Sequence, residues 1–310
     1  MTQRSSYDCR FIGGKNFIRR AWRRFIYRFI FGFCEQFGVH VLPADYTSPV
    51  PDTRDLRRRQ AEWYKASEMP GVELNLPEQV QLLKSLEIYK NEFCELPEHD
   101  DLVRAGIGLG FGDVEAHILY AMVRLFRPAK ILEVGSGVST YYSDLALKKN
   151  GPGSICCVEP YPMKQFEAYA ACQQISLLRT VAQSLDWSVF ESLGKNDILF
   201  IDSSHILKLG SDVWFLYLEA LPRLRPGVLV HVHDICFPFP CPEPNEWIMR
   251  RHQFWNESAL LQAMLCGNSH LHIILCSSFL AFSHPSELSR VFPIYDPRKS
   301  APASIWLRVL

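Results

Sequence analysis

The sequence carries no net charge, because 33 lysines and arginines are balanced by 33 aspartates and glutamates. A general nucleic-acid binder is usually basic overall, so this balance argues against that class. Ten cysteines are present, yet none belongs to a C-x-x-C pair. Such spacing is typical neither of a zinc knuckle nor of a small disulfide scaffold, and it favours a reducing compartment.

Long hydrophobic runs, internal repeats and low-complexity tracts are missing as well. A membrane-spanning helix needs about 18 or more consecutive apolar residues, and no stretch approaches that length. Arginines interrupt the N-terminal region, where a secretory signal would have a clean apolar run. These absences predict a cytoplasmic location.

Two regions of the chain differ in character. Residues 1–40 are basic and aromatic, and residues 41–101 mix prolines, charges and short helical patterns. From about residue 112, apolar runs alternate with helical patterns. The 310 residues are enough for one large domain with an arm, or for two domains. We expect an N-terminal helical extension over residues 1–111 and an α/β domain over residues 112–310.

The second region predicts a Rossmann-like, doubly wound parallel sheet of seven strands, because strands and helices alternate along it. Several apolar runs lack internal alternation, as expected for strands covered on both faces. The last two strands are joined by a loop at 283–303 without room for a crossover helix, which favours an antiparallel last strand. We expect strands at 130–134, 154–159, 176–181, 197–202, 227–234, 271–276 and 304–309, and helices at 114–126, 140–149, 163–174, 187–193, 211–224 and 257–266.

A glycine-containing loop follows the first expected strand, in the sequence I-L-E-V-G-S-G-V-S-T of residues 131–140. Gly135 and Gly137 permit a tight turn and a close approach of the backbone to a ligand. Glu159 ends the second strand, where a carboxylate can accept two hydrogen bonds from a ribose diol. The pattern indicates a nucleoside-containing cofactor, and the alternative is a plain glycine turn beside a surface glutamate.

The same loop distinguishes between cofactors. A dinucleotide-binding loop has the pattern G-x-G-x-x-G, but Thr140 stands at its third glycine position. Glu133 stands two residues before the first glycine, where its carboxylate would oppose a pyrophosphate and suit a cationic ligand. A nicotinamide-dependent oxidoreductase is therefore a disfavoured alternative, and a non-catalytic cofactor-binding protein is another.

The pattern E-x-G-x-G resembles the first motif of class I methyltransferases that use S-adenosylmethionine (SAM), over roughly residues 112–310. The runs D-I-L-F-I-D-S-S-H, R-P-G-V-L-V-H-V-H-D-I and P-F-P-C-P resemble a bacterial branch of these enzymes, and this similarity reaches back to about residue 40. The resemblance implies SAM as cofactor but names no acceptor. It implies that the glycine loop lies along the methionine part of SAM, that Glu159 binds the ribose and that the adenine lies near residues 183–186. The implied cofactor-binding residues are Glu133, Gly135, Ser136, Gly137, Glu159, Ser184 and Asp202.

Ionisable side chains stand at the ends of the fourth and fifth expected strands. Asp202 and His205 follow the fourth strand, and His233 and Asp234 end the fifth, in G-V-L-V-H-V-H-D-I. The two ends are neighbours across the expected sheet, and perturbed titratable groups gather at functional sites. The alternative is a core histidine at 233 and a turn cap at 234. For His231, deeper in the strand, we prefer a core histidine that finds a hydrogen bond.

Two mechanisms fit these residues. In the favoured one, His205 or His233 is a general base that removes a proton from an attacking hydroxyl, and Asp202 or Asp234 orients its ring. In the other, Asp202, His233 and Asp234 hold a divalent metal, an arrangement similar to metal-dependent O-methyltransferases of the catechol and macrolide-sugar type. His233 replaces the first residue of their acidic pair, which disfavours Mg²⁺ and leaves room for a softer metal such as Zn or Fe.

The expected acceptor is a hydroxyl of a small molecule or a sugar, because the ionisable residues suit deprotonation of an oxygen. An amine acceptor stays open. Tyr46, Phe111 and Asp113 are predicted to line the acceptor pocket, since N-terminal additions often cover the carboxyl ends of the strands in class I methyltransferases. A packing role for Tyr46 and Phe111 is the alternative.

Residues 16–33, N-F-I-R-R-A-W-R-R-F-I-Y-R-F-I-F-G-F, predict an amphipathic helix. Its apolar residues fall on one broad face, and its arginines fall on the opposite one. Such a helix can lie on an anionic membrane surface. The alternative, which we favour, is a helix that packs on the catalytic domain or on a second subunit.

Overall fold

The computed structural model describes residues 20–310. Contacts divide the chain into two compact units, Met1–Gln60 and Ala61–Leu310, and the first is described from residue 20 onward. The expected division lay between residues 111 and 112, but the segment before it packs with the sheet. Leu83 and Leu86 of this segment are fully buried in one hydrophobic core with Ile131 of the first strand. Apolar burial therefore joins residues 61–111 to the sheet, and their role as a substrate cap stays a prediction.

The first unit contains the described part of the predicted amphipathic helix. Residues 20–25 are helical and continue into η1 (Ile26–Phe31) and α2 (Gly32–Glu35). Residues 16–19 of the predicted helix lie outside the described residues. The short helix α3 (Thr53–Arg58) follows in this unit, and α4 (Gln60–Trp63) begins at the unit's last residue and continues into the second unit.

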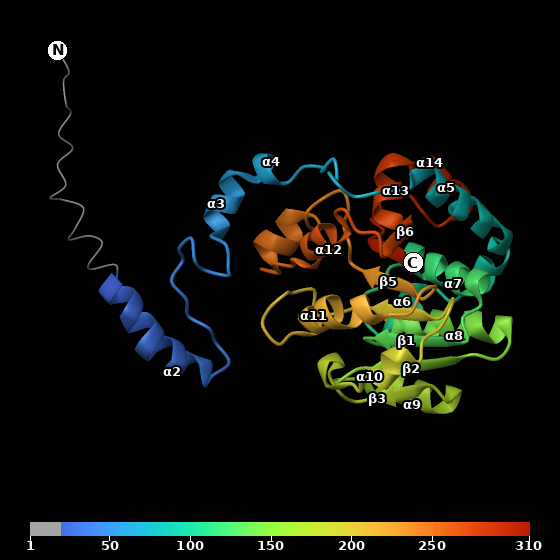
Figure 1. The fold of residues 1–310 in the computed structure, drawn as a ribbon, viewed down its shortest axis with the longest axis horizontal. Coiled ribbons are helices and arrows are strands. Elements are labelled where there is room, and N and C mark those ends of the chain that lie inside the picture. Colours follow the sequence, from blue (N-terminus) through green and yellow to red (C-terminus); the bar gives the residue numbers. More distant parts are fainter. Residues whose placement is uncertain (1–19) are drawn as a thin grey trace, which may run out of the picture. The chain divides into compact units, whose positions relative to one another are not determined.

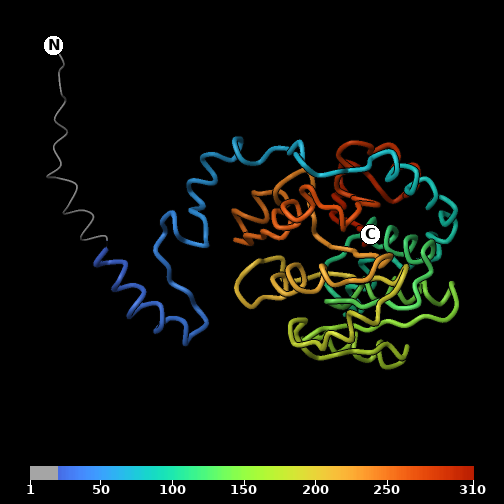
Figure 2. The backbone as a smooth tube through the Cα atoms, viewed as in Figure 1, coloured from blue at the N-terminus to red at the C-terminus, as the bar shows by residue number. Residues whose placement is uncertain are grey.

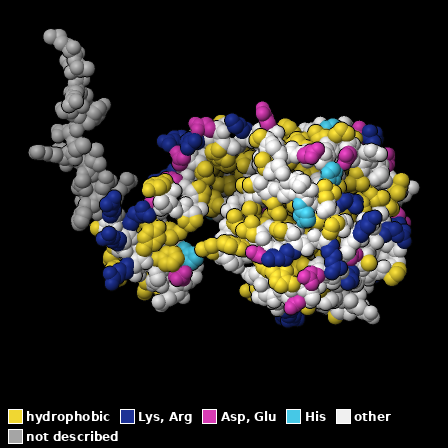
Figure 3. Space-filling model, in the orientation of Figure 1, with side chains coloured by type: hydrophobic (Ala, Val, Ile, Leu, Met, Phe, Trp, Pro, Cys, Tyr) yellow, Lys and Arg dark blue, Asp and Glu magenta, His cyan; other side chains and the backbone are white. Residues whose placement is uncertain are grey.

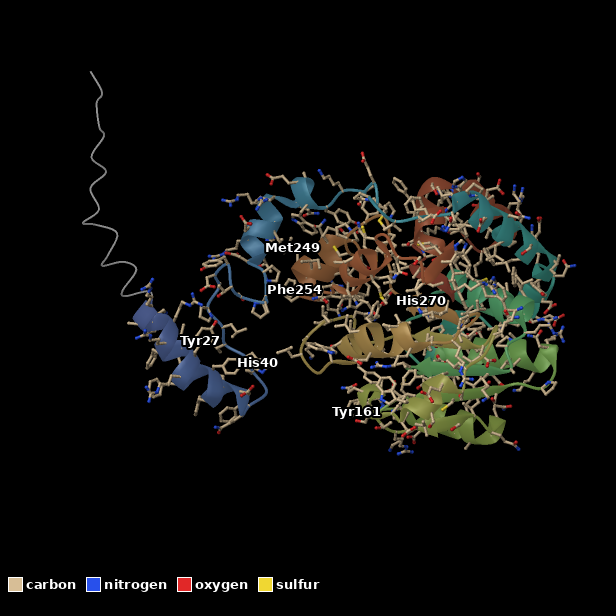
Figure 4. All side chains as sticks on the ribbon, viewed as in Figure 1. Tyr27, His40, Tyr161, Met249, Phe254 and His270 are labelled. Carbon is tan, nitrogen blue, oxygen red and sulfur yellow. The ribbon has the colours of Figure 1, made fainter. Side chains whose placement is uncertain are left out.

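Large apolar side chains of this helix stay exposed. Ile26 is buried, whereas Trp22, Phe29 and Phe33 are 59%, 57% and 63% exposed. Figure 3 shows hydrophobic and basic side chains close together on this unit, and Figure 4 shows Tyr27 and His40 on it. Within residues 20–310, no helix combines the length and the apolar character that crossing a membrane requires.

The second unit is built on a seven-stranded sheet with the order β3-β2-β1-β4-β5-β7-β6 (Figure 1). The first five strands are parallel to one another, and β7 is antiparallel to both of its neighbours. The C-terminal strand thus lies between β5 and β6 (Figure 2). This arrangement confirms the predicted fold class. The strands are β1 (Lys130–Val134), β2 (Ser154–Val158), β3 (Ser176–Leu178), β4 (Ile198–Ile201), β5 (Leu229–His233), β6 (Leu271–Cys276) and β7 (Ser304–Val309).

Helices cover both faces of the sheet, which explains why the strands are apolar without alternation. In β1, Ile131 packs into one hydrophobic core and Leu132 into the other. All four residues of β4 are buried. The α-helices between residues 76 and 265 are α5 (Leu76–Ser85), α6 (His99–Arg104), α7 (Asp113–Phe126), α8 (Val138–Asn150), α9 (Lys164–Gln173), α10 (Trp187–Glu191), α11 (Asp212–Phe215) and α12 (Glu257–Leu265). Short 3-10 or π segments are η2 (Leu86–Tyr89), η3 (Glu92–Glu95), η4 (Ala182–Ser184), η5 (Leu216–Ala220), η6 (Leu221–Arg223) and η7 (Asn245–Arg250).

The connection between β6 and β7 differs from the prediction of a loop. It contains two helices of seven residues each, α13 (Ser277–Ser283) and α14 (Pro285–Val291). Leu280, Leu288 and Val291 on these helices are fully buried, so packing against the core stabilises turns that are short by themselves. The last strand is nevertheless antiparallel, as predicted.

Candidate active site

The glycine loop joins β1 to α8 at the carboxyl edge of the sheet. Gly135 has a φ of +100°, and a Cβ atom at this position would lie 2.9 Å from the backbone oxygen of Asp202. Gly137 has a φ of +148°, and an added Cβ would lie 3.2 Å from the Cα atom of Gly108. The loop therefore needs glycine for its backbone conformation and for the close approach of two neighbouring segments.

A cavity of about 490 Å³ opens beside this loop, with Gly135, Glu159, Gln183 and Asp202 in its wall. The Glu159 carboxylate directly follows β2 and accepts a hydrogen bond from the backbone N–H of Tyr161 at 2.8 Å. The Tyr161 side chain is 87% exposed and is labelled in Figure 4. Of the implied cofactor-binding residues, this wall contains Gly135, Glu159 and Asp202.

The other implied cofactor-binding residues lie outside the wall described for this cavity. Ser136 and Gly137 continue the loop, and Ser184 ends η4 next to Gln183, which does line the cavity. Their roles toward a cofactor stay predictions.

Glu133 is buried in β1, with only 1% of its surface exposed. Its carboxylate accepts a hydrogen bond from the Ser139 hydroxyl of α8 at 2.5 Å. Burial penalises the charged form and raises the pKa of Glu133 to about 7, although hydrogen bonds from Ser139 and Thr140 oppose this shift. The geometry thus connects Glu133 to the start of α8, and its predicted contact with the cofactor stays a prediction.

His205 lies among three carboxylates. Its Nδ1 atom is 2.7 Å from Oε2 of Glu257, and its Nε2 atom is 3.4 Å from carboxylate oxygens of both Asp202 and Asp234. His205 is 8% exposed and its ring packs against Trp255, with centroids 4.4 Å apart. Sequence reasoning did not identify Glu257, which is 1% exposed and begins α12.

These carboxylates control the protonation of His205. Burial alone would lower its pKa, but the hydrogen bonds that His205 donates to Asp202 and Glu257 outweigh burial and raise the pKa to about 10. Burial of Asp202 would raise its pKa, but the hydrogen bond to His205 and the nearby imidazoles bring it below its usual value. Without another cation, His205 is therefore an imidazolium at neutral pH, and a protonated imidazole cannot accept the proton of a hydroxyl.

The same residues form a set of metal-ligand atoms. One ligand atom each from Asp202, His205 and Asp234 can be chosen so that all three lie within 4.8 Å of one another. Glu257 holds Nδ1 of His205, which leaves Nε2 directed toward both aspartates, as in many metal sites where a carboxylate orients a histidine ligand. This set contains His205 where the sequence predicted His233.

His233 lies next to this set and is 6% exposed. Its Nε2 atom is 3.7 Å from Oδ1 of Asp234, and its Nδ1 atom is buried without a hydrogen-bond partner among residues 20–310. The ring of Phe111 packs against it at 4.7 Å between centroids. The Nδ1 atom of His233 is therefore buried rather than open to the cavity, and the predicted roles of His233 as base or ligand stay predictions.

A second cavity, of about 520 Å³, opens above the ionisable residues. Asp202, His205, His233 and Asp234 line it together with the predicted acceptor residues Phe111 and Asp113. Tyr46 belongs to the unit Met1–Gln60 and is 96% exposed, so its predicted role stays a prediction. Asp202 belongs to the walls of both the first and the second cavity.

His231 is a core histidine, as expected, but its nitrogens lack the hydrogen bond that we expected. Both ring nitrogens are buried without a partner. The ring stacks on Phe200 at 4.2 Å and meets Trp306 edge-on at 4.7 Å. Burial lowers the pKa of His231 well below its usual value, so the ring is neutral and belongs to the packing of β5.

Comparison with known proteins supports the resemblance of the sheet unit to methyltransferases. Residues 132–235 match a family described as a methyltransferase domain. An uncharacterized protein of Archaeoglobus fulgidus is 29% identical over 166 residues, which are 50% of this chain and 75% of that protein.

Two solved structures cover more of the chain at lower identity. The O-methyltransferase TomG of Streptomyces achromogenes, in complex with SAM, is 15% identical over 83% of this chain and 96% of its own, with a TM-score of 0.41. The methyltransferase PaMTH1 of Podospora anserina, bound to S-adenosylhomocysteine (SAH), is 15% identical over 88% of this chain and 99% of its own, with a TM-score of 0.42. These similarities are too distant to assign an acceptor. The match of residues 132–235 to a methyltransferase domain agrees with the motifs of the sequence that resemble class I SAM-dependent methyltransferases.

Proposed function

We propose that the protein transfers the methyl group of SAM to a hydroxyl of a small-molecule acceptor. The single observation that carries this proposal is the position of Asp202 in the walls of both the 490 Å³ cavity and the 520 Å³ cavity. A cofactor in the first cavity and an acceptor in the second would meet at this residue. Alignment of the acceptor oxygen with the S–CH₃ bond would supply much of the rate acceleration, because holding two reactants in line removes an entropic cost.

The residues of the first cavity suit SAM. Glu159 would accept hydrogen bonds from the ribose hydroxyls, and the segment containing Gln183 would lie beside the adenine. The backbone at Gly135 would approach the methionine part of the cofactor. The match to methyltransferase domains favours this assignment over the nicotinamide-dependent alternative, which has no comparable support.

The acceptor hydroxyl must lose a proton, and the geometry argues against a free His205 as the base. Its pKa of about 10 keeps the ring protonated at neutral pH. The negative charges of the three nearby carboxylates would attract a divalent cation. Asp202, His205 and Asp234 would supply its ligand atoms. Such an ion, when bound, lowers the pKa of a coordinated hydroxyl. One nitrogen and two carboxylate oxygens suit several divalent transition metals better than they suit Mg²⁺ alone.

A metal-free reaction remains as the second candidate, with His233 as the base. The specific observation in its favour is that His233 lines the acceptor cavity, with its Nε2 atom 3.7 Å from Oδ1 of Asp234. His205 would then stay protonated and would orient Asp202 and Asp234 through its Nε2 atom.

Calorimetric titration with SAH tests the cofactor assignment. We expect one specific site in the unmodified protein and none in Gly135→Arg, because that side chain would clash with the Asp202 backbone. Gly32→Arg is the matched control, since nothing lies within 4 Å of a Cβ atom there. Production of SAH from SAM with hydroxylated acceptors would then test the transfer. Binding of a nicotinamide dinucleotide without binding of SAH would overturn the proposal.

A further inference from the structure

A third cavity, of about 440 Å³, adjoins the acceptor cavity. The two share Asp234, Trp247 and residues 300–303 in their walls. Asp234 thus lies at the boundary between the two cavities. Asp202 and the two active-site histidines line the acceptor cavity and are absent from the described wall of the third cavity. A molecule that enters both cavities would pass directly beside Asp234.

Aromatic side chains dominate the walls of the third cavity. Phe239 stacks on Tyr64 at 5.2 Å between ring centroids and meets Phe282 edge-on at 5.8 Å. Phe239 belongs to the sequence C-F-P-F-P-C-P of residues 236–242, which follows β5. The methyl transfer proposed above gives this part of the loop no role.

The third cavity is also poor in charge. Among the described residues of its wall, Asp234 and Glu243 are the charged ones. Burial raises the pKa of Tyr64 to about 12, which agrees with a weakly hydrated surrounding. A wall of this kind gains free energy when it removes apolar surface from water, and it offers few partners to a sugar with many hydroxyls.

We propose that the third cavity binds an apolar part of the acceptor, so that the substrate is a lipophilic hydroxy compound. Its hydroxyl lies beside Asp202 and Asp234, and its apolar ring or chain lies against Tyr64 and Phe239. This inference rests on the proposed methyl transfer and narrows its substrate class. A bare sugar would leave the aromatic walls uncovered.

Binding of 4-alkylphenols to the SAH-loaded protein tests this inference without requiring turnover. Titration calorimetry should show the dissociation constant falling about threefold to fourfold for each added methylene, until the chain is longer than the cavity. Methyl glucoside should bind far more weakly than any member of the series. Equal affinity along the series, or preference for the glucoside, would overturn the inference.

Variants in the wall of the third cavity show whether the alkyl chain binds there. Phe239→Ala should remove most of the dependence on chain length. Phe282→Ala should weaken this dependence, and because Phe282 is 54% exposed, its replacement removes less buried surface than that of a core aromatic. Ile88→Ala, 71% exposed in η2, is the control and should keep the full dependence. An unchanged dependence in both aromatic variants would show that the alkyl chain binds elsewhere. If the unmodified protein did not bind SAH, that result would instead contradict the proposed methyl transfer itself.

Discussion

The Nδ1 atom of His205 lies 2.7 Å from a carboxylate oxygen of Glu257, although 52 residues separate them in the sequence. Ser203 donates a hydrogen bond to the other oxygen of Glu257 at 2.9 Å. These contacts fix the orientation of the imidazole ring and direct its Nε2 atom toward the two active-site aspartates. In the proposed reaction, Glu257 would therefore be a positioning residue that acts through His205.

The stability of the protein should depend on pH through His205. Its folded-state pKa of about 10 exceeds the ordinary value of 6.5, so its contribution is complete below pH 6.5 and disappears as the pH rises toward 10. The difference in unfolding free energy between the unmodified protein and His205→Gln should therefore shrink over this range, by on the order of a few kcal/mol. Urea unfolding in excess EDTA measures it. Parallel pH curves for the two proteins would contradict the raised pKa.

Removal of metal should abolish methyl transfer if Asp202, His205 and Asp234 bind an ion. EDTA should then stop the reaction, and one divalent ion should restore it. Asp234→Asn should lose the metal because it removes an anionic oxygen ligand, while SAH affinity survives because Asp234 is absent from the described wall of the cofactor cavity.

The control for the metal experiment is Asp100→Asn, an aspartate with a 76% exposed side chain outside the active site. It should respond to EDTA and to added metal as the unmodified protein does. Full activity in excess chelator would exclude the ion and favour His233 as base. In that case His233→Ala should lower the rate by about a hundredfold or more.

Glu133→Gln should change how the free energy of unfolding depends on pH, and it should have little effect on the affinity for SAH. The folded-state pKa of about 7 exceeds the ordinary value of 4.5, so folding weakens as the pH rises between these values. The glutamine variant lacks this loss and should gain on the order of a few kcal/mol relative to the unmodified protein between pH 4.5 and 8. Urea unfolding and SAH titration measure the two effects. A large loss of SAH affinity with unchanged stability would restore Glu133 to the cofactor site.

Deletion of residues 1–60 should leave the sheet unit folded and able to bind SAH, because contacts divide the chain after Gln60. Deletion of residues 1–110 should instead unfold the protein, since it removes Leu83 and Leu86 from the core. Thermal unfolding and SAH titration distinguish the two truncations. If the shorter deletion also abolished SAH binding, the first unit would be needed to form the cofactor site.

The exposed apolar side chains of the N-terminal helix favour membrane binding over the packing on protein that we preferred from the sequence, so this helix should bind anionic vesicles. Residues 9–34 contain seven cationic side chains and no acidic one, and Trp22, Phe29 and Phe33 are exposed beside them. Sedimentation with phosphatidylserine vesicles should show binding that weakens with salt and is absent with neutral vesicles. Glutamine at Arg20, Arg24 and Arg28 should reduce it tenfold or more, whereas glutamine at the control residues Lys65, Lys84 and Lys164 should not. Dimer formation without vesicle binding would assign this face to a second copy of the chain.

The sequence by itself determined the architecture of the sheet unit. Apolar runs at the positions of β1, β6 and β7 predict those strands to the residue, because a strand buried on both faces must be apolar along its whole length. Gly135 was likewise recognisable from the sequence, since a positive φ in a turn selects glycine locally. These properties depend on neighbours along the chain, and the sequence contains them directly.

The tertiary structure decided which ionisable residues meet. His205 and His233 are equivalent candidates in the sequence, but the backbone places His205 between Asp202 and Asp234, with Glu257 behind it. The burial of Glu133 and the helices between β6 and β7 also depend on packing against distant residues. Protonation has the same cause, because the pKa of His205 is raised by the carboxylates of Asp202 and Glu257. These two residues come from separate segments, and no local pattern in the sequence shows that the segments will be neighbours.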